Sequence, residues 1–284
     1  MDDLASLLLE RIRRVFPELG FEHAELIDHG EDHQVVVLDG AWVFRFPRNA
    51  AYLASFPAEL ALLAALSAQT PVPTPVYEWV APDRSFGGYR RLPGEALTAS
   101  RFHGMDRGGQ EALITQLADF LRVLHAMAGG PPRTDEGWRA AEVGDYVSWR
   151  RARLAPRIDA ALLARIDRAH QLYAAVEWER SAVIHGDFTS AHILIEPGAR
   201  AVSGVIDFGD AVVGDPAFDF TLFHGLADWA PAFALDAYGD GNEGMLMRSA
   251  FSFIRYAAAR LSDSEAAPGE ATAAIERALR RVGL

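Results

Sequence analysis

The chain has 284 residues, 50% of them hydrophobic, and a formal net charge of −12 at pH 7. This length and composition predict a globular protein with a substantial buried core, built as one large domain or two lobes. The sequence contains no cysteine and no lysine. These absences exclude thiol nucleophiles, disulfides, cysteine-ligated metals, Schiff-base enzymes and the lysine-containing P-loop.

The charge pattern limits the partners and the location. No arginine-rich run of useful length is present, so the sequence does not predict binding to nucleic acid. No apolar run approaches the roughly 20 residues of a membrane-spanning helix, and the first residues are acidic, unlike those of a secretory signal. We therefore expect a cytoplasmic protein with no membrane partner. The negative charge suits a cationic small substrate and simple solubility equally well.

The first part of the chain predicts one helix followed mainly by strands. The periodicity and the turn residues predict a helix over 3–15, a hairpin over 34–46 with a two-residue turn at Asp39-Gly40, a helix over 57–68, and strands near 76–81 and 86–92.

Beyond residue 94 the pattern is mainly helical, with short apolar strands over 182–206. The expected helices lie over 111–127, 157–176, 244–261 and 269–282. Strands first and then helices predict an α+β protein. We expect a small β-rich lobe over residues 1–92 and a larger, mainly helical lobe over 93–284.

The segment 183–220 carries the residues with chemical potential. A short apolar lead-in delivers His185-Gly186-Asp187, and a strand over 202–206 delivers Asp207-Phe208-Gly209. A hairpin between them would hold Asp187 and Asp207 near adjacent strand ends. Phosphoryl transfer needs a carboxylate to accept the proton of the attacking hydroxyl, and oxygen ligands for Mg²⁺. The order of these groups, with His192 five residues after Asp187, matches the protein-kinase pattern H-R-D-x-x-x-x-N followed by D-F-G.

The strings HGDFTSAHIL and GVIDFGDAVVGDP resemble the catalytic and metal-binding loops of the aminoglycoside phosphotransferase family and its macrolide-phosphorylating relatives. The resemblance is strongest over 182–220 and continues over about 25–95. It implies a bilobal, protein-kinase-like fold and transfer of the γ-phosphoryl group of ATP or GTP to a hydroxyl of a small molecule. An aminoglycoside is the first expectation for this acceptor, with a macrolide or another hydroxylated metabolite as alternatives.

Carried over residue by residue, the resemblance implies that Asp187 is the catalytic base and that Asp207 and His192 hold the metal. His192 stands where many relatives have asparagine, and its imidazole nitrogen suits the hard Mg²⁺ ion less well than an amide oxygen. We therefore expect looser binding of Mg²⁺, or better tolerance of Mn²⁺. His185 and Asp219 are expected to support the catalytic loop.

The resemblance also implies a nucleotide site in the first lobe. Arg45 takes the place of the phosphate-pairing lysine of many kinases, which is feasible because a guanidinium is always charged. Glu59, on the following helix, is its expected ion-pair partner. Gly30 is the single glycine of the expected phosphate loop, 28–33. The residues expected to meet the purine are Tyr89, Arg90, Arg91 and Leu92.

The residues after Asp207 predict a helix start, with Asp215 as N-cap and Pro216 in the first helical position. The candidates for binding the acceptor are Asp210, Asp228, Trp229 and Asp236. Carboxylates suit a polycationic acceptor, whereas the aromatic residues of this region leave a partly hydrophobic one open.

Two other classes of protein remain open at this point. A metal-dependent hydrolase would use His185, Asp187, His192 and Asp207 as metal ligands. A pseudokinase would bind nucleotide without turnover. This alternative is favoured by Arg45 and His192, which stand where many kinases have lysine and asparagine.

Overall fold

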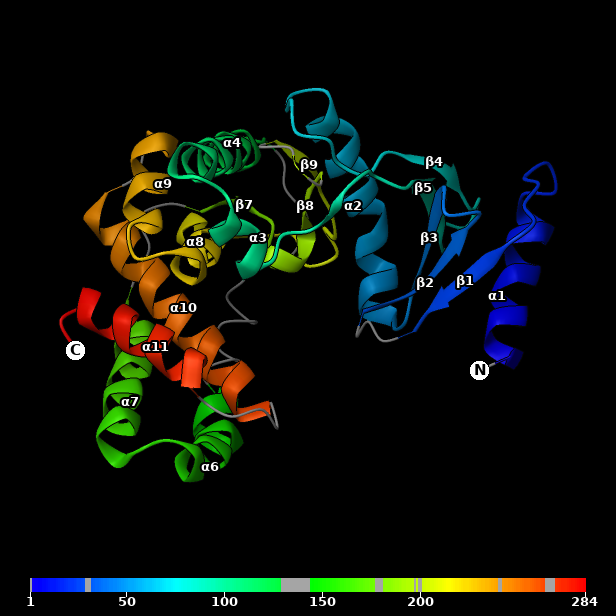
Figure 1. Ribbon diagram of the computed structural model, residues 1–284. Coiled ribbons are helices and arrows are strands. Elements are labelled where there is room, and N and C mark those ends of the chain that lie inside the picture. The colour runs from blue at the N-terminus through cyan, green and yellow to red at the C-terminus, as the bar shows by residue number, and fades with distance from the viewer. Residues whose placement is uncertain are drawn as a thin grey trace.

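The computed structural model describes residues 2–28, 32–128, 144–176, 181–196, 198, 201–239, 242–263 and 269–284. An antiparallel sheet and two helices form one end of the molecule, and the other end is mainly helical (Figure 1). The expected α+β class is confirmed.

Five antiparallel strands form the N-terminal sheet in the order β1-β2-β3-β5-β4. Their bounds are Ala24–Ile27 for β1, His33–Leu38 for β2, Trp42–Pro47 for β3, Tyr77–Val80 for β4 and Gly87–Arg90 for β5. Helix α1 (Asp2–Val15) packs its buried Leu8 and Ile12 into the core of this sheet, where Phe44 is completely buried. The predicted helix and strands are therefore present.

The hairpin of β2 and β3 turns where the sequence predicts, with one difference in length. Asp39 and Gly40 both have positive φ, and the Ala41 amide donates to the Leu38 carbonyl at 2.9 Å. Leu38 pairs with Trp42, so three residues connect the strands instead of two.

Helix α2 (Ala50–Ser67) begins well before the predicted start at residue 57. The Asn49 side chain accepts hydrogen bonds from the amides of Ala51 and Tyr52 at 3.0 and 3.1 Å, which caps the helix. Pro57, the first residue of the predicted range, lacks an amide donor. It instead lies inside the helix.

By length and composition alone, α2 is apolar enough to cross a membrane, and among the described residues it is the one helix that meets this test. The core helix of a soluble protein can pass the same test of length and composition. Leu62, Leu63 and Leu66 of α2 are buried against the helical part of the molecule, and α2 lies between the sheet and that part (Figure 1).

Short strands occupy the centre of the second part. They are β6 (Glu95–Ala96), β7 (Ala182–Ile184), β8 (Ile193–Ile195), β9 (Val202–Val205) and β10 (Val212–Gly214). The expected hairpin is formed by β8 and β9. Two pairings were not expected from the sequence: β6 adds to β8 and extends the hairpin, and β10 pairs with β7 in a separate two-stranded sheet.

The chain passes from the sheet to this hairpin through Gly94, which has a φ of 99°. A Cβ atom at this position would lie 2.3 Å from Ser203 Oγ and 2.7 Å from the Ile195 carbonyl oxygen. Only glycine therefore permits the close approach. Ser203 Oγ also donates to the Pro93 carbonyl at 2.7 Å, which ties the connection to β9.

The other regular elements of the described chain are helices. They are α3 (Ala99–Gly104), α4 (Arg107–His125), η1 (Tyr146–Arg150), α6 (Arg151–Leu154), η2 (Ala155–Arg157), α7 (Ala160–Ala175), η3 (Ser190–His192), η4 (Pro216–Phe220), α8 (Thr221–Leu226), α9 (Ala230–Tyr238), α10 (Glu243–Asp263) and α11 (Gly269–Arg281). Asp215 caps η4 by accepting from the Ala217 amide at 3.0 Å, so the predicted N-cap is confirmed.

Two apolar clusters hold the helical part together. One joins α4, α8 and α9 to the β8–β9 hairpin around residues such as Phe120 and Val205. The other joins α7, α10 and α11 around Ile166, Ile254 and Ile275, all completely buried. The first cluster places the β8–β9 hairpin, and with it the residues after β9, on a rigid base.

Candidate active site

Arg45 is the centre of a buried polar cluster on β3. Its Nη1 donates to Glu59 Oε1 at 2.6 Å and to Tyr77 Oη at 3.5 Å, and Arg45 and Glu59 are each only 4% exposed. Burial by itself would lower the pKa of Arg45, but the carboxylates of Asp207 and Glu59 raise it well above its ordinary value. The guanidinium is therefore charged, and the structure brings it to the partner expected from the sequence.

Asp207 lies just after β9 and receives a hydrogen bond from Nη2 of Arg45 on its Oδ1. Its φ of 67° lies in the left-handed region, which residues other than glycine rarely adopt. Residues held in this conformation cluster at functional sites. Burial by itself would raise the pKa of Asp207, but Arg45 and then His192 outweigh it and hold the pKa well below its ordinary value. Asp207 is therefore a carboxylate at neutral pH.

His33, at the start of β2, is a site residue that the sequence analysis missed. Its Nδ1 lies 3.0 Å from Nη2 of Arg45, and its ring packs on Tyr52 with centroids 5.5 Å apart. Burial and the charge of Arg45 lower the pKa of His33 to about 3, so the ring is neutral and Nδ1 accepts. The alternation of side chains along a strand could have indicated this position. His33 lies on the same face of β2 as Val35, and Val35 pairs with Arg45 in the sheet.

Asp187 lies in the loop after β7, and His185 joins that loop to the residue before Asp207. His185 Nε2 donates to the Ile206 carbonyl at 3.0 Å, while Nδ1 accepts from the Asp187 amide at 3.3 Å. Burial lowers the pKa of His185 to about 4, which keeps this neutral tautomer. Gly186, with a φ of 82°, is needed between them because a Cβ would lie 2.3 Å from the Asp210 carbonyl oxygen.

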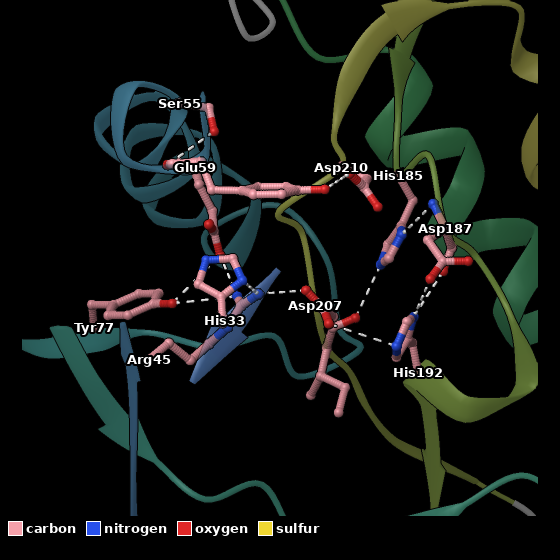
Figure 2. Close-up of polar contacts among 12 residues, drawn as sticks. His33, Arg45, Ser55, Glu59, Tyr77, His185, Asp187, His192, Asp207 and Asp210 are labelled. Atoms are coloured by element: carbon pink, nitrogen blue, oxygen red, sulfur yellow. Dashed lines mark hydrogen bonds and ion pairs between the residues drawn. The ribbon is translucent and has the colours of Figure 1, made fainter. Parts of the chain in front are cut away.

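His192 lies between Asp187 and Asp207 (Figure 2). Its Nδ1 is 2.9 Å from the Asp187 carbonyl oxygen and 3.3 Å from Oδ2 of the same residue, and its Nε2 is 3.6 Å from Asp207 Oδ2. Nε2 is the ring nitrogen that faces Asp207. Burial raises the pKa of Asp187, although His192 opposes this, and a raised pKa makes the carboxylate a better proton acceptor.

Asp219, which is completely buried on η4, is bonded to the loop that carries Asp187. Its carboxylate accepts from the amides of His185 and Gly186 at 2.8 and 3.2 Å. His125 Nε2 lies 3.1 Å from Asp219 Oδ2, and His125 Nδ1 lies 3.1 Å from Tyr238 Oη. Side chains from α4, η4 and α9 therefore hold the backbone just before Asp187.

A cavity of about 530 Å³ lies between the N-terminal sheet and the β8–β9 hairpin. Its apolar lining comes mainly from Ile27, Val35, Val37, Val43, Leu194 and Ile206. Arg45 and Asp207 also line it, as do Tyr89, Arg91 and Leu92. An apolar pocket of this volume with a few charged groups is typical of a cofactor or nucleotide site.

Arg90 does not line this cavity. Its guanidinium stacks on Trp42 at 4.4 Å, lies 3.5 Å from Glu78 Oε1 and is 67% exposed. Gly30, the expected phosphate-loop glycine, lies outside the described residues.

Asp210 faces the same polar cluster and joins it to α2. Its Oδ1 accepts from Tyr52 Oη at 3.2 Å. Burial, followed by the charges of Asp32, Asp207 and Asp187, raises the pKa of Asp210 to about 6. The structure therefore gives Asp210 a partner within the protein.

The other three expected acceptor-binding residues lie beside α8 and on α9. Asp228 Oδ1 is 2.9 Å from Arg277 Nε and 3.4 Å from Arg281 Nη2, so two guanidinium groups offset its charge. The ring of Trp229 lies 3.3 Å from the Arg107 guanidinium carbon. Asp236 is exposed on α9.

Asp207 and His192 are the side chains placed to share a metal ion. Within the described ranges, no group of three or more His, Cys, Asp and Glu residues is arranged to hold one. Mg²⁺ usually keeps one or two protein carboxylates and completes its shell with phosphate oxygens and waters. The two-residue set therefore fits a metal that arrives with a nucleotide.

Solved structures of phosphotransferases share this fold. The GDP and kanamycin complex of APH(2")-IIIa superposes with a TM-score of 0.77 at 21% identity, covering 98% of this chain and 97% of that one. Macrolide 2'-phosphotransferase MphH from Brachybacterium faecium, an apoenzyme structure, gives a TM-score of 0.62 at 24% identity, with 98% and 97% covered. The expected kinase-like architecture is therefore confirmed.

A curated relative and a family model give the sequence side of the comparison. The uncharacterized protein YcbJ of Bacillus subtilis (strain 168) is 27% identical over 227 residues, which are 71% of this chain and 70% of the relative. The model of the phosphotransferase enzyme family, APH, matches residues 23–258. That match spans both the 530 Å³ cavity and the loops of Asp187 and Asp207, and the chain belongs to the APH phosphotransferase enzyme family.

Proposed function

We propose that the protein transfers the γ-phosphoryl group of ATP or GTP to a hydroxyl of a small molecule. The observation that carries the proposal is His192 set between Asp187 and Asp207, with Arg45 on the other side of Asp207 (Figure 2). This arrangement would supply a proton acceptor, a metal-binding carboxylate and a fixed positive charge side by side, and Arg45 and Asp207 line the cavity. Phosphoryl transfer requires little more from a protein than such positioning and charge.

Asp187 acts as the general base in this proposal. As the acceptor oxygen forms its bond to the γ-phosphorus, its proton passes to the Asp187 carboxylate, and the bond to the leaving ADP or GDP breaks. Support comes from the two amides that Asp219 fixes just before Asp187. Because that loop is held on buried helices, the carboxylate is pre-positioned.

Asp207 and His192 would hold Mg²⁺, which neutralises charge on the nucleotide phosphates when it is bound. Arg45 Nη2 donates to Asp207, and the same guanidinium is suited to bidentate contact with a phosphate. We keep the expectation of better tolerance of Mn²⁺, since His192 supplies nitrogen where oxygen is preferred. A metal-dependent hydrolase is less well supported, because it needs a larger ligand set than the described residues bring together.

We place the nucleotide between residues 1–92 and residues 93–284, since both parts line the 530 Å³ cavity. The acceptor belongs to the aminoglycoside or macrolide class in this proposal, in keeping with the kanamycin complex and the macrolide 2'-phosphotransferases among the similar structures. A cytoplasmic location, where ATP and GTP are available, is part of the same proposal.

The test is a coupled nucleotide-turnover assay with ATP and GTP against aminoglycosides and macrolides. Asp187→Asn should lower kcat by about 100-fold or more, because the amide cannot take the proton, while the Kd for nucleotide stays the same. Asp119→Asn, which alters an exposed carboxylate on α4, is the matched control and should keep full turnover. Full turnover by Asp187→Asn would refute the proposed base, and nucleotide binding without acceptor-stimulated turnover would favour a pseudokinase.

A further inference from the structure

Tyr52, in the first turn of α2, bonds to the segment that follows Asp207. Its Oη donates to Asp210 Oδ1 at 3.2 Å. Burial, followed by hydrogen bonding to Asp32 and the charge of Asp210, raises the pKa of Tyr52 well above its ordinary value, so the hydroxyl keeps its proton and donates. The bond therefore joins residues 1–92 to residues 93–284 beside the proposed catalytic groups.

The backbone of Asp210 in turn meets the loop that carries Asp187 (Figure 2). A Cβ added at Gly186 would lie only 2.3 Å from the Asp210 carbonyl oxygen. Gly186 directly precedes Asp187 in the chain. A side chain that holds Asp210 therefore acts where the loop of Asp187 and the segment after Asp207 touch.

Tyr52 also packs against the polar cluster of Arg45. Its ring lies on His33 with centroids 5.5 Å apart, and His33 Nδ1 accepts from Nη2 of Arg45 at 3.0 Å. The same Nη2 donates to Asp207. Both ends of the segment from Asp207 to Asp210 are therefore held by one connected group of side chains from the N-terminal sheet and α2.

The backbone of Asp207 needs such support. Its φ of 67° is a conformation that persists only where the surrounding structure holds it. The next residue, Phe208, is buried in the core, and Arg45 bonds to the Asp207 carboxylate. In the proposed function Arg45 also turns to a nucleotide phosphate, which weakens its hold on Asp207. The bond from Tyr52 to Asp210 then continues to tie this segment to α2.

We propose that Tyr52 is a positioning residue, which acts through Asp210 to keep Asp207 in its metal-binding position when a nucleotide is bound. The inference rests on the proposed function, because it takes Asp207 as a metal ligand. Tyr52 itself touches neither nucleotide nor metal in this proposal. Its hydroxyl should therefore contribute to the gain in nucleotide affinity that Mg²⁺ provides, and not to nucleotide affinity without metal.

The test measures nucleotide affinity without turnover. Dissociation constants for a non-hydrolysable analogue of ATP or GTP are determined by calorimetry, once with Mg²⁺ and once with EDTA. Tyr52→Phe removes the hydroxyl and keeps the ring that packs on His33. Tyr146→Phe is the matched control, because it removes a hydroxyl that donates to Asp167 at 2.8 Å in the helical part.

Tyr52→Phe should reduce the tightening by Mg²⁺ about fivefold, as expected for the loss of one hydrogen bond, and leave the Kd in EDTA within about twofold. Tyr146→Phe should change neither quantity. Asp210→Asn and Asp210→Ala both remove the charge, but Asp210→Asn keeps an acceptor oxygen and Asp210→Ala does not. Tyr52→Phe should therefore keep its effect in the Asp210→Asn background and lose it in the Asp210→Ala background.

A wild-type response to Mg²⁺ in Tyr52→Phe would overturn this inference and leave the proposed function standing. Equal losses of affinity with Mg²⁺ and with EDTA, or the same effect of Tyr52→Phe in both Asp210 backgrounds, would show that the hydroxyl does not act through Asp210 on the metal-binding position. A wild-type protein that binds no nucleotide, or binds it equally with and without Mg²⁺, would overturn the proposed function together with this inference.

Discussion

Arg45 of β3 joins the sheet to the loop that carries Asp207. Its Nη1 contacts Glu59 and Tyr77, while its Nη2 contacts His33 and Asp207. A planar guanidinium presents several donors in a fixed fork, whereas the ammonium group of lysine is a single point charge. The arginine at this strand position is therefore matched by a set of partners that lysine could not all reach.

Arg45→Lys should destabilise the protein by about 1–3 kcal/mol, since at least one buried partner loses its hydrogen bond. The KM for nucleotide should rise by about tenfold for the loss of roughly one charge-assisted hydrogen bond. Urea denaturation and nucleotide titration measure these effects. Arg84→Lys, in the exposed turn before β5, is the control and should change neither quantity. An Arg45→Lys protein with wild-type stability and KM would show that the fork is dispensable.

At the scale of secondary-structure elements, three helical segments position the loop of Asp187. Asp219 of η4 bonds to the loop amides, His125 of α4 bonds to Asp219, and Tyr238 of α9 bonds to His125. All three side chains are at least nine-tenths buried. The network therefore links the packing of α4 against α9 to the backbone just before Asp187.

Asp219→Asn should lower both stability and turnover, because an amide group offers one acceptor oxygen where the carboxylate has two. We expect a loss of about 2–4 kcal/mol, in the range for breaking a buried polar network, and a drop in kcat of tenfold or more from misplacement of Asp187.

Tyr238→Phe removes the outermost hydroxyl of the same network. It should cost about 1 kcal/mol and leave kcat within about twofold, because the bonds to the loop remain. Thermal denaturation and kcat measured on both variants provide the comparison. Equal losses of kcat in the two would contradict the idea that Asp219 acts directly on the loop.

At the scale of the whole molecule, burial keeps several histidines neutral. Burial lowers the pKa of His33 and His224 to about 3, and that of His170 and His185 to about 4, from 6.5. In the unfolded chain these rings take up protons near pH 6.5, whereas in the folded protein they stay neutral until about pH 4. The unfolded state therefore binds more protons as the pH falls, and acid favours unfolding.

The stability that these groups contribute is fully present above about pH 6.5 and is lost as the pH falls toward 4. Asp210, with its pKa raised to about 6, has the opposite effect, as do Asp187 and Glu59, whose pKa values burial also raises, but these three groups are set against four histidines. We expect the free energy of unfolding to fall by at least about 2 kcal/mol between pH 7 and pH 5. Urea denaturation at both values measures this.

His170 allows this pH prediction to be checked away from the active site. Its ring stacks on Tyr146 in the helical part with centroids 3.4 Å apart. His170→Gln removes one titrating group and should reduce the pH dependence relative to the wild-type protein. A wild-type stability that is flat or rises toward pH 5 would contradict the burial of neutral imidazoles.

The α+β class, most of the order of elements and the family could be predicted from the sequence. Each of these features is local: helical periodicity lies within one segment, as over 269–282, and the turn at Asp39-Gly40 depends on adjacent residues. Asp187, His192 and Asp207 likewise lie within one hairpin and its flanking loops. Their spacing can therefore be recognised in the sequence without knowledge of the rest of the fold.

The tertiary structure alone decided which side chains meet from distant segments. It brought His33 to Arg45, turned Arg90 out of the cavity and placed Asp228 between two arginines of α11. Such contacts depend on strand register and helix packing, where a one-residue change of register reverses the face of every side chain. Sequence spacing determined the chemistry that this protein carries, and packing between distant segments determined the direction in which each group points.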